Sequence, residues 1–433
     1  MTPKVVDELE RIKHLDAEEI FDHLPSKRCG EADRRYITEV LDDGFGNRDS
    51  ANMLGRFEQA FADKFGVKHS ISHNSGSGTM LSCLLAAGAG PGDEVIVPTL
   101  TMAATAYVAV QCGAVPVFCD SDPDTYNIEA PHIEQKITEH TRAIIPVSIF
   151  GLPPDLPAIM ALAAKYDLTV IEDNAQCYLA TCHDQLVGTI GDASSFSFQG
   201  SKHMMSGGSG GMVIAKESTY ARNIRKASIQ GYRTLEATPG ATIIPRDERQ
   251  DWGYERHDRL GYNFRMSAPQ AALGLAQLER LEWLVAARCS IAAQYEAVIR
   301  DENCDWLIAP HIPAGRTHSY WCYTCRLDEE KLGVNWRQFR RKFIEMGGDG
   351  LYGAWVPVHM EPIFRSMSFY GSRNRAPNFD PRYGGKVKRY GEGDCPNVEL
   401  LRKTLCLFKT SMQSLDAVRS QVDALRKTIR YYA

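Results

Sequence analysis

The sequence lacks any apolar run of about 18 residues, the length that a membrane-spanning helix needs. It also lacks a basic excess, because 49 Lys and Arg residues stand against 54 Asp and Glu residues, a formal net charge of −5 at pH 7. Nucleic-acid binding normally requires a basic surface, so we expect no nucleic-acid partner. The first 20 residues are polar and acidic and have no apolar signal-peptide core. We therefore expect a soluble, cytoplasmic protein without membrane contact.

Closely spaced cysteines are scarce as well. The 12 cysteines are scattered along 433 residues, unlike the dense pattern of a small disulfide scaffold. Only Cys322 and Cys325 have CxxC spacing, and no second Cys or His pair stands beside them. Free cysteine is commonly a buried apolar residue. We therefore favour a structural role for this pair over zinc or redox chemistry, and we expect no metal site.

Short apolar runs alternate with longer amphipathic stretches from about residue 66 onward. A chain of this length with 44% hydrophobic residues can form two or three domains, each with a hydrophobic core. Strand–helix alternation with apolar strands is typical of α/β proteins with a mainly parallel sheet covered by helices on both faces. The predicted strands are 94–100, 114–120, 142–150, 168–174, 194–200 and 210–216.

The remaining segments suggest three parts. We predict an N-terminal helical segment over 1–50, a large α/β domain over 51–285 and a smaller α+β domain over 286–433. One long helix, from about residue 267 to residue 300, would connect the two domains. Residues 231–256 and 364–394 are rich in turn formers and charge, which indicates long loops, and a loop that long is functional or mobile.

Four segments of the α/β region carry residues suited to catalysis or to anion binding. They are a Ser/Gly loop at 75–78, an apolar strand ending in Asp173, a second strand followed by Lys202 and a Gly-rich turn, and the polar run 259–270 before the long helix. Ligands bind beyond the carboxyl ends of strands in open α/β sheets, and a desolvated lysine can act as a nucleophile. Taken singly, however, a plain turn, a helix cap or an exposed loop lysine explains each segment as well or better.

Taken together, the segments resemble one family. The order SGS, GPGDEVIVPTLT, EDNAQ, SFSF-x3-K, GxGG, GYNFRMS and QAALGLAQL is similar to that of the DegT/DnrJ/EryC1/StrS sugar aminotransferases, from about residue 50 to beyond 290. The resemblance implies fold type I, a large and a small domain, and dependence on pyridoxal 5′-phosphate, with pyridoxamine phosphate as the intermediate form. It also implies a cytoplasmic homodimer with shared active sites.

The resemblance assigns roles to individual residues. Lys202 matches the lysine that binds the cofactor aldehyde as an imine, and Asp173 matches the carboxylate that keeps the cofactor ring nitrogen protonated. Gln176 matches the residue at the ring hydroxyl. Lys202 and Asp173 are therefore the expected catalytic residues.

The phosphate-binding residues also follow from the resemblance. Gly76, Ser77 and Gly78 match the family's phosphate loop, where Ser77 replaces the usual threonine, and Ser197 matches a phosphate-contacting serine. Asn263 matches an asparagine that reaches the phosphate from the second subunit.

Three positions depart from the family pattern, and the substrate pocket is less well defined. Met102 stands where an aromatic residue usually stacks on the cofactor ring, and Ser209 and Ser148 replace a common acid and a common histidine. A thioether can still pack on a ring face. The residues expected to bind substrate are His318, Tyr320, Trp355 and His359. For the two histidines a packing or subunit-contact role is the favoured alternative.

The expected reaction transfers an amino group from glutamate or glutamine to a keto-sugar, usually nucleotide-linked in this family. The residue pattern around Lys202 also resembles that of members that aminate cyclitol ketones, so a cyclitol ketone is the alternative acceptor. A less favoured alternative is a keto-sugar 3-dehydratase, in which a histidine replaces the lysine. His203 lies next to Lys202, but the spacing from Ser197 places the lysine at the catalytic position. A cofactor-binding regulator or an inactive relative is disfavoured, because both catalytic residues are present.

Overall fold

The computed structural model describes residues 4–45, 52–367, 369 and 390–433. Its centre is a seven-stranded sheet with the strand order β1-β9-β8-β5-β4-β2-β3. The strands are β1 (His69–His73), β2 (Glu94–Pro98), β3 (Val115–Cys119), β4 (Thr141–Ile144), β5 (Thr169–Asp173), β8 (Ala193–Ser197) and β9 (Gly211–Ala215). Strands β3, β2, β4, β5 and β8 run parallel to one another. Strand β9 pairs antiparallel with β8 on one side and with β1 on the other. The expected mainly parallel α/β sheet is confirmed.

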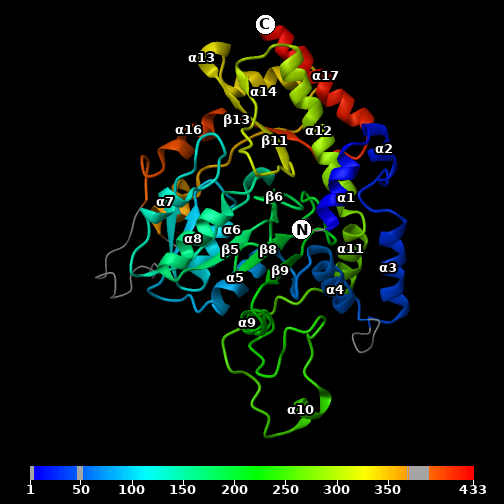
Figure 1. Ribbon diagram of the computed structural model, residues 1–433, viewed down its shortest axis with the longest axis vertical. Helices are drawn as coiled ribbons and strands as arrows, with labels where there is room; N and C mark the ends of the chain where they lie inside the picture. The colour runs from blue at the N-terminus through cyan, green and yellow to red at the C-terminus, as the bar shows by residue number, and fades with distance from the viewer. Residues whose placement is uncertain (1–3, 46–51, 368, 370–389) are drawn as a thin grey trace.

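Helices cover both faces of this sheet (Figure 1). Successive side chains of a strand point to opposite faces, so Val95 of β2 packs with α5, α6 and α9 while its neighbour Ile96 packs with α7 and α8. The five helices are α5 (Gly76–Ala86), α6 (Ala104–Gln111), α7 (Ala130–Glu134), α8 (Leu156–Tyr166) and α9 (Ser218–Ser228).

The structure corrects the strand predictions at two places: one strand was missed and one is shorter than predicted. The segment before residue 74 is strand β1, which sequence reasoning missed because HSISH is largely polar, although all five residues are buried. The predicted strand 142–150 ends at Ile144. Pro146 has no N–H to donate to a ladder, and a short turn η1 (Ile149–Gly151) follows in which Phe150 has a φ of 56°.

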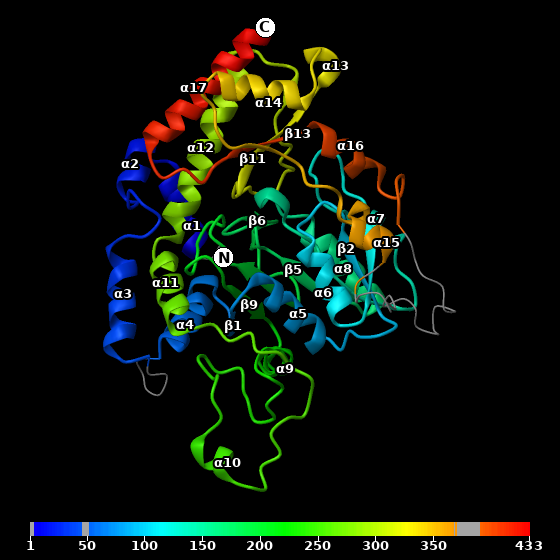
Figure 2. The ribbon, with the colours of Figure 1, turned by 180° about the vertical axis from the view of Figure 1, so that it is seen from behind.

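The N-terminal helices pack beside a pair of helices that lead out of the large sheet (Figure 2). They are α1 (Lys4–Lys13), α2 (Ala17–Asp22), α3 (Glu31–Asp42) and α4 (Met53–Phe65), and the pair is α11 (Ala268–Leu278) and α12 (Leu281–Asp301). The single helix predicted over 267–300 is therefore two helices. Arg280 leaves helical geometry at the break, where its guanidinium donates to Asp33 of α3 at 2.6 Å.

A second, four-stranded sheet has the order β10-β11-β13-β12. Its strands are β10 (Leu307–Ile308), β11 (Cys322–Leu327), β12 (Leu351–Gly353) and β13 (Leu405–Lys409). The helices and turns of this part of the chain are α13 (Glu329–Leu332), α14 (Trp336–Glu345), η2 (Val358–Met360), α15 (Pro362–Ser366), α16 (Pro396–Thr404) and α17 (Leu415–Tyr432). Cys322 and Cys325 are both buried and unbridged in β11. The boundaries predicted at residues 50 and 285 stay a prediction.

Between α9 and α11 the chain forms an arm, residues 231–256, that protrudes from the body of the molecule (Figures 1 and 2). The arm carries the short helix α10 (Arg246–Gln250) and is otherwise irregular, and Trp252 on it is fully exposed. Of the predicted loop 364–394, residue 368 and residues 370–389 lie outside the described residues. None of the helices in the described ranges is both long enough and apolar enough to span a bilayer.

Candidate active site

A cavity of about 410 Å³ lies beyond the carboxyl ends of β5 and β8. Such edges of open α/β sheets are where ligands bind. The lining residues are Ser75, Gly76, Ser77, Met80, Met102, Ala104, Thr105, Asp173, Ala175, Gln176, Ser197, Gln199, Ser201, Lys202, Ser209, Gly210, Trp321 and Trp355. The fold thus brings together most of the residues that the sequence singled out.

Asp173 is the last residue of β5 and is buried. One carboxylate oxygen accepts from the Thr105 hydroxyl at 2.9 Å, and the other accepts from the Ala175 N–H at 3.1 Å. Burial raises the pKa of Asp173, and these two donors and the positive charge of Lys202 oppose that rise. The carboxylate is therefore fixed in orientation and suited to a cationic or N–H partner in the cavity.

Lys202 follows β8 on a short turn in which its N–H donates to the Gln199 carbonyl at 2.9 Å. Its Nζ lies 4.9 Å from the centre of the Trp321 ring. Burial lowers the pKa of the Lys202 amine to about 8, with Asp173 opposing the shift and Arg288 adding to it. A much larger neutral fraction near pH 8 makes this amine a better nucleophile and base than a solvated lysine.

Two arginines, the buried Arg288 and the half-buried Arg28, hold the backbone at Lys202, and sequence reasoning missed both. Arg288 of α12 donates to the carbonyls of Ser201 and Lys202, each at 3.0 Å, and to the Trp321 carbonyl at 2.7 Å. Arg28 also donates to the Lys202 carbonyl and, at 3.2 Å, to the next carbonyl. A signal for Arg288 was present, because an arginine on the apolar face of a helix needs buried acceptors.

The opposite end of the cavity is built for an anion. Helix α5 begins there at Gly76, and Ser75 caps it by accepting from the Gly78 N–H at 3.1 Å. The first N–H groups of a helix have no intrahelical acceptor, so those of Gly76 and Ser77 remain for a ligand, together with the helix dipole. A Cβ on Gly76 would lie 2.9 Å from the Ser197 Cβ, so only glycine lets α5 approach β8 this closely.

Between the lysine end and the anion-binding end of the cavity, some side chains are held by hydrogen bonds and others are exposed. Gln176 accepts from the Phe150 N–H at 2.8 Å through its side-chain oxygen, which leaves its amide nitrogen as a donor. Met102 is 61% exposed in the cavity wall. The indole of Trp321, which the sequence left unassigned beside Tyr320, forms another part of the wall.

Five predicted residues do not line this cavity. Gly78 lies within α5 and is engaged by the Ser75 cap, and Asn263 lies outside, with its side-chain oxygen accepting from Arg265 at 3.0 Å. His318 is buried and stacked on Tyr320, with ring centres 4.0 Å apart. His359 is fully buried. Its ring nitrogens contact the hydroxyl of Thr99 at 2.5 Å and the carboxylate of Glu399 at 3.2 Å.

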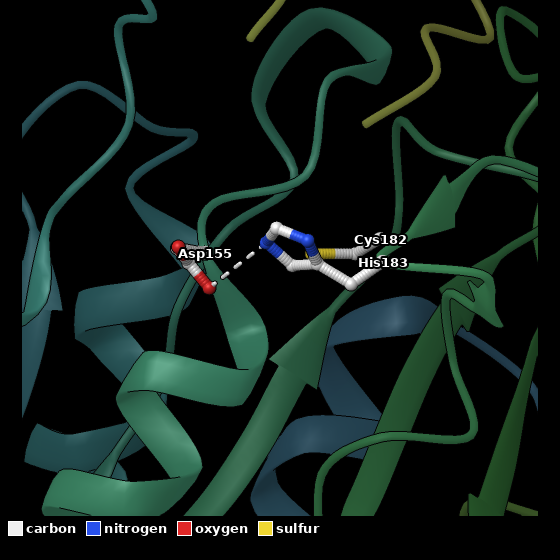
Figure 3. A group of neighbouring side chains, drawn as sticks. All are labelled: Asp155, Cys182 and His183. Carbon is white, nitrogen blue, oxygen red and sulfur yellow. Dashed lines mark ion pairs between the residues drawn. The ribbon is translucent and has the colours of Figure 1, made fainter. Parts of the chain in front are cut away.

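One group of metal-ligand side chains lies elsewhere, where the hairpin of β6 (Thr181–Cys182) and β7 (Gln185–Leu186) faces α8 (Figure 3). His183 Nε2 lies 3.6 Å from Asp155, and Cys182 points at the Pro154 carbonyl. Asp155 already caps α8, accepting at 3.2 Å, and Arg316 lies 3.8 Å from its second oxygen. These contacts give the group a role in holding the hairpin turn against α8.

Comparison with known proteins identifies the family. The sequence profile of the DegT/DnrJ/EryC1/StrS aminotransferase family matches residues 27–380. A GDP-perosamine synthase of Caulobacter vibrioides is 37% identical over 310 residues, which cover 71% of this chain and 77% of the relative. A UDP-N-acetyl-3-dehydro-alpha-D-glucosamine 3-aminotransferase of Acidithiobacillus ferrooxidans is 37% identical over 295 residues, 67% of this chain and 73% of the relative.

Solved structures agree with this assignment. The X-ray structure of an aminotransferase from Psychrobacter cryohalolentis superposes with a TM-score of 0.79 at 26% identity, covering 93% of this chain and 98% of that one. The sequence motifs, the mainly parallel sheet and these matches have one consequence. The chain belongs to the DegT/DnrJ/EryC1/StrS family of sugar aminotransferases, which have fold type I and depend on pyridoxal phosphate.

Proposed function

We propose that this protein transfers the amino group of glutamate or glutamine to the carbonyl carbon of a nucleotide-linked keto-sugar. The observation that carries the proposal is the presence of Lys202 and Asp173 in one cavity at the carboxyl ends of adjacent strands. The anion cradle at the start of α5 lies in the same cavity.

The donor set fits pyridoxal phosphate. Asp173 would pair with the ring nitrogen, the Gln176 amide would face the ring hydroxyl, and Met102 would pack on the ring. The N–H groups of Gly76 and Ser77 and the hydroxyls of Ser77 and Ser197 would hold the phosphate. When bound, the cofactor supplies an electron sink that stabilises negative charge on the substrate carbon.

The protein's own groups would then orient the substrate and move protons. Lys202 Nζ, with its lowered pKa, would take a proton from the substrate carbon and return it to a carbon two bonds away, as a general base and then a general acid. Asp173, held by Thr105 and Ala175, would keep the ring nitrogen protonated throughout. The Trp321 ring, with its centre 4.9 Å from Lys202 Nζ, forms the cavity wall beside the amine.

The acceptor class is supported by the relatives' names. One relative is named for a GDP-linked amino sugar and another for amination at C3 of a UDP-linked keto-sugar. A cyclitol ketone stays the alternative acceptor. The dehydratase alternative finds less support, because His203 is fully buried, donates from Nε2 to the Ser319 carbonyl and does not line the cavity.

A homodimer with shared sites is part of the proposal. Asn263 follows the arm, and Ile243 and Trp252 leave apolar surface on that arm exposed. A second copy of the chain would cover this surface and receive Asn263 at its phosphate cradle.

The first test is the visible absorption of purified protein incubated with pyridoxal phosphate and then titrated with glutamate and glutamine. We expect a band that one of these donors bleaches, that Lys202→Ala abolishes, and that persists in Lys427→Ala, a change of an exposed lysine. A band that no donor alters would contradict the transaminase proposal, and a band that survives in Lys202→Ala would contradict the role of Lys202.

A further inference from the structure

Two arginine side chains from distant segments converge on the carbonyl side of the Lys202 turn. Arg288 of α12 donates to the carbonyls of Ser201 and Lys202, each at 3.0 Å. Arg28, which lies between α2 and α3, donates to the carbonyls of Lys202 and His203. Neither arginine is among the described residues that line the catalytic cavity, so both lie behind the lysine. We call Arg28 and Arg288 the arginine clamp.

The clamp holds the backbone of Lys202 from both sides. The Lys202 N–H donates to the Gln199 carbonyl at 2.9 Å, and its carbonyl accepts from the two arginines. Because a peptide unit is planar, donors that fix the direction of a carbonyl also fix the ψ angle of that residue. The direction of the Lys202 Cα–Cβ bond is thereby set, and only the side-chain torsions remain free.

Arg288 also ties the lysine turn to the smaller sheet. Its guanidinium donates to the Trp321 carbonyl at 2.7 Å, just before β11, and to the Thr410 hydroxyl at 3.2 Å, just after β13. Trp321 Nε1 donates back to the Ser201 carbonyl at 3.1 Å, and the indole ring centre lies 4.9 Å from Lys202 Nζ. One arginine side chain therefore fixes the amine relative to the cavity wall that Trp321 forms.

The clamp has no counter-charge. Within the described parts of the chain, no Asp or Glu oxygen lies within 4.0 Å of either guanidinium group, whereas the buried Arg225 pairs with Glu58 at 2.7 Å. Burial and the nearby Arg28 lower the pKa of Arg288, but a guanidinium stays protonated at neutral pH. A buried charge without a partner is costly, and an apolar side chain would fill the same space at a lower cost. This cost points to a role beyond packing.

The charged and titratable groups that face the Lys202 amine come from three elements and from the turn itself. Asp173 at the end of β5 favours the protonated amine, whereas Arg288 of α12 disfavours it. Burial raises the pKa of the Cys322 thiol in β11 to about 12 and lowers the pKa of His203, so both are neutral near pH 7. Burial of the amine has the largest effect on its pKa, and the charge of Arg288 acts in the same direction.

We propose that Arg288 and Arg28 are positioning residues for the amino transfer. They hold the Lys202 turn by its carbonyls, and Arg288 sets the amine against the Trp321 wall, so that Nζ stays directed into the cavity. The inference rests on the proposed function, because it takes Lys202 as the group that moves the proton. The clamp acts on the reaction only through that lysine.

Four variants test the clamp. Arg288→Lys keeps the charge but replaces the planar fork by a single ammonium, which cannot reach all four acceptors at once. Arg288→Met removes the charge, and Arg28→Met removes the second arginine. Arg225→Lys is the matched control, because it makes the same change at a buried arginine whose partner is Glu58 and not the lysine turn.

The first measurement needs neither cofactor nor substrate. The full-length unloaded protein is acetylated with acetic anhydride over a range of pH, and peptide mass spectrometry gives the rate at each lysine. For Lys202 we expect a half-maximal rate near pH 8 in the wild type and at higher pH in Arg288→Met, because a positive neighbour is gone. At neutral pH the rate should fall about threefold or more, which corresponds to half a pKa unit. The exposed Lys427 should react equally in both proteins.

The second measurement is the rate at which glutamate or glutamine bleaches the enzyme loaded with pyridoxal phosphate. Arg288→Lys should lower the rate at saturating donor about tenfold or more, since a misplacement of about 1 Å can cost a hundredfold. The donor concentration for half-maximal rate should change little, because no ligand contact is lost. Arg28→Met should lower the rate as well. Arg225→Lys should leave it unchanged, even where urea unfolding shows a less stable protein.

Two results would overturn the inference. One is a Lys202 profile in Arg288→Met and a bleaching rate in Arg288→Lys that both match the wild type. The other is an equal loss of rate in Arg225→Lys, which would assign the effect to general destabilisation. If Arg288→Met does not fold, the bleaching rates of Arg288→Lys and Arg28→Met decide. Absence of bleaching in the wild type would refute the proposed function instead. The acetylation profile does not depend on that reaction, so the two failures are distinguishable.

Discussion

Gly76 sets how closely the start of helix α5 can approach strand β8. An added Cβ would lie 2.9 Å from the Ser197 Cβ and 3.2 Å from its hydroxyl oxygen. We predict that Gly76→Ala weakens pyridoxal phosphate binding about tenfold or more. Overpacking costs about 1–3 kcal/mol, and about 1.4 kcal/mol corresponds to tenfold. Fluorescence titration of the unloaded protein with pyridoxal phosphate measures the change.

The matched control for this substitution is Gly200→Ala. Gly200 lies close to Lys202 in sequence, but an added Cβ there would meet no atom within 4 Å. It should leave cofactor affinity unchanged. If Gly76→Ala bound pyridoxal phosphate as tightly as Gly200→Ala, α5 and β8 would adjust freely to the added Cβ. The close approach would then not matter for cofactor binding.

At the scale of elements, a buried ion pair joins helix α4 to helix α9. Arg225 donates two hydrogen bonds to Glu58, at 2.8 and 2.7 Å, and both side chains are fully buried. The same carboxylate accepts from the N–H groups of Ser72 in β1 and Gly240 in the arm. Glu58 therefore connects four segments that are distant in sequence.

We predict that Glu58→Gln lowers the free energy of unfolding by about 3–5 kcal/mol, because it leaves Arg225 buried without its counter-charge. Burial alone raises the pKa of Glu58, but Arg225 and the backbone donors outweigh it and lower that pKa. The stabilisation is thus present above the carboxyl's unfolded pKa and lost as pH falls through the lower folded pKa.

Urea unfolding between pH 3 and pH 8 checks both statements. The wild type should lose this contribution towards acid, and the difference from Glu58→Gln should shrink there. Glu8→Gln breaks a surface ion pair with Arg11 and is the control, expected to change little because exposed pairs are screened by solvent. A difference that grows in acid would contradict the assignment.

At the scale of the whole molecule, the proposal of shared sites predicts complementation between inactive variants. Lys202→Ala and Asn263→Ala should each be inactive or nearly so. In a mixed dimer, one site carries both changes and the other carries neither. After subunit exchange at equal amounts, about half the dimers are mixed, so about a quarter of wild-type activity should return.

Activity of the mixture in the amino-donor half-reaction measures this recovery. Mixing Lys202→Ala with Asp173→Ala is the control, because both residues lie in the same subunit's cavity. A mixed dimer then has two damaged sites and should stay inactive. Absence of recovery in the test pair, as in the control, would place Asn263 at its own subunit's site.

The sequence predicted much of the large sheet and the residues at its edge. Apolar runs marked β2, β3, β5 and β9, because strands buried on both faces are usually apolar. Strand β8 was predicted as well, although three of its five residues are serines. It missed β1, whose polar residues are buried through their own hydrogen bonds, such as that of His73 Nε2 with Ser82 at 3.0 Å. Pattern alone also could not show that Arg280 would end a helix, since its partner Asp33 lies on a distant segment.

The spacing of a few residues along the chain is enough to predict the chemistry of this protein. Lys202, Asp173 and the Ser/Gly loop stand at fixed spacings around short strands, and such local spacing decides which side chains reach the sheet edge. The surroundings of these residues depend on how the chain folds. Arg288 and Trp321 lie 86 and 119 residues beyond Lys202, and the packing of α12 and of the segment before β11 brings them to the lysine. The lowered pKa of Lys202 follows from that packing, because burial and charge proximity depend on position in space rather than order along the chain.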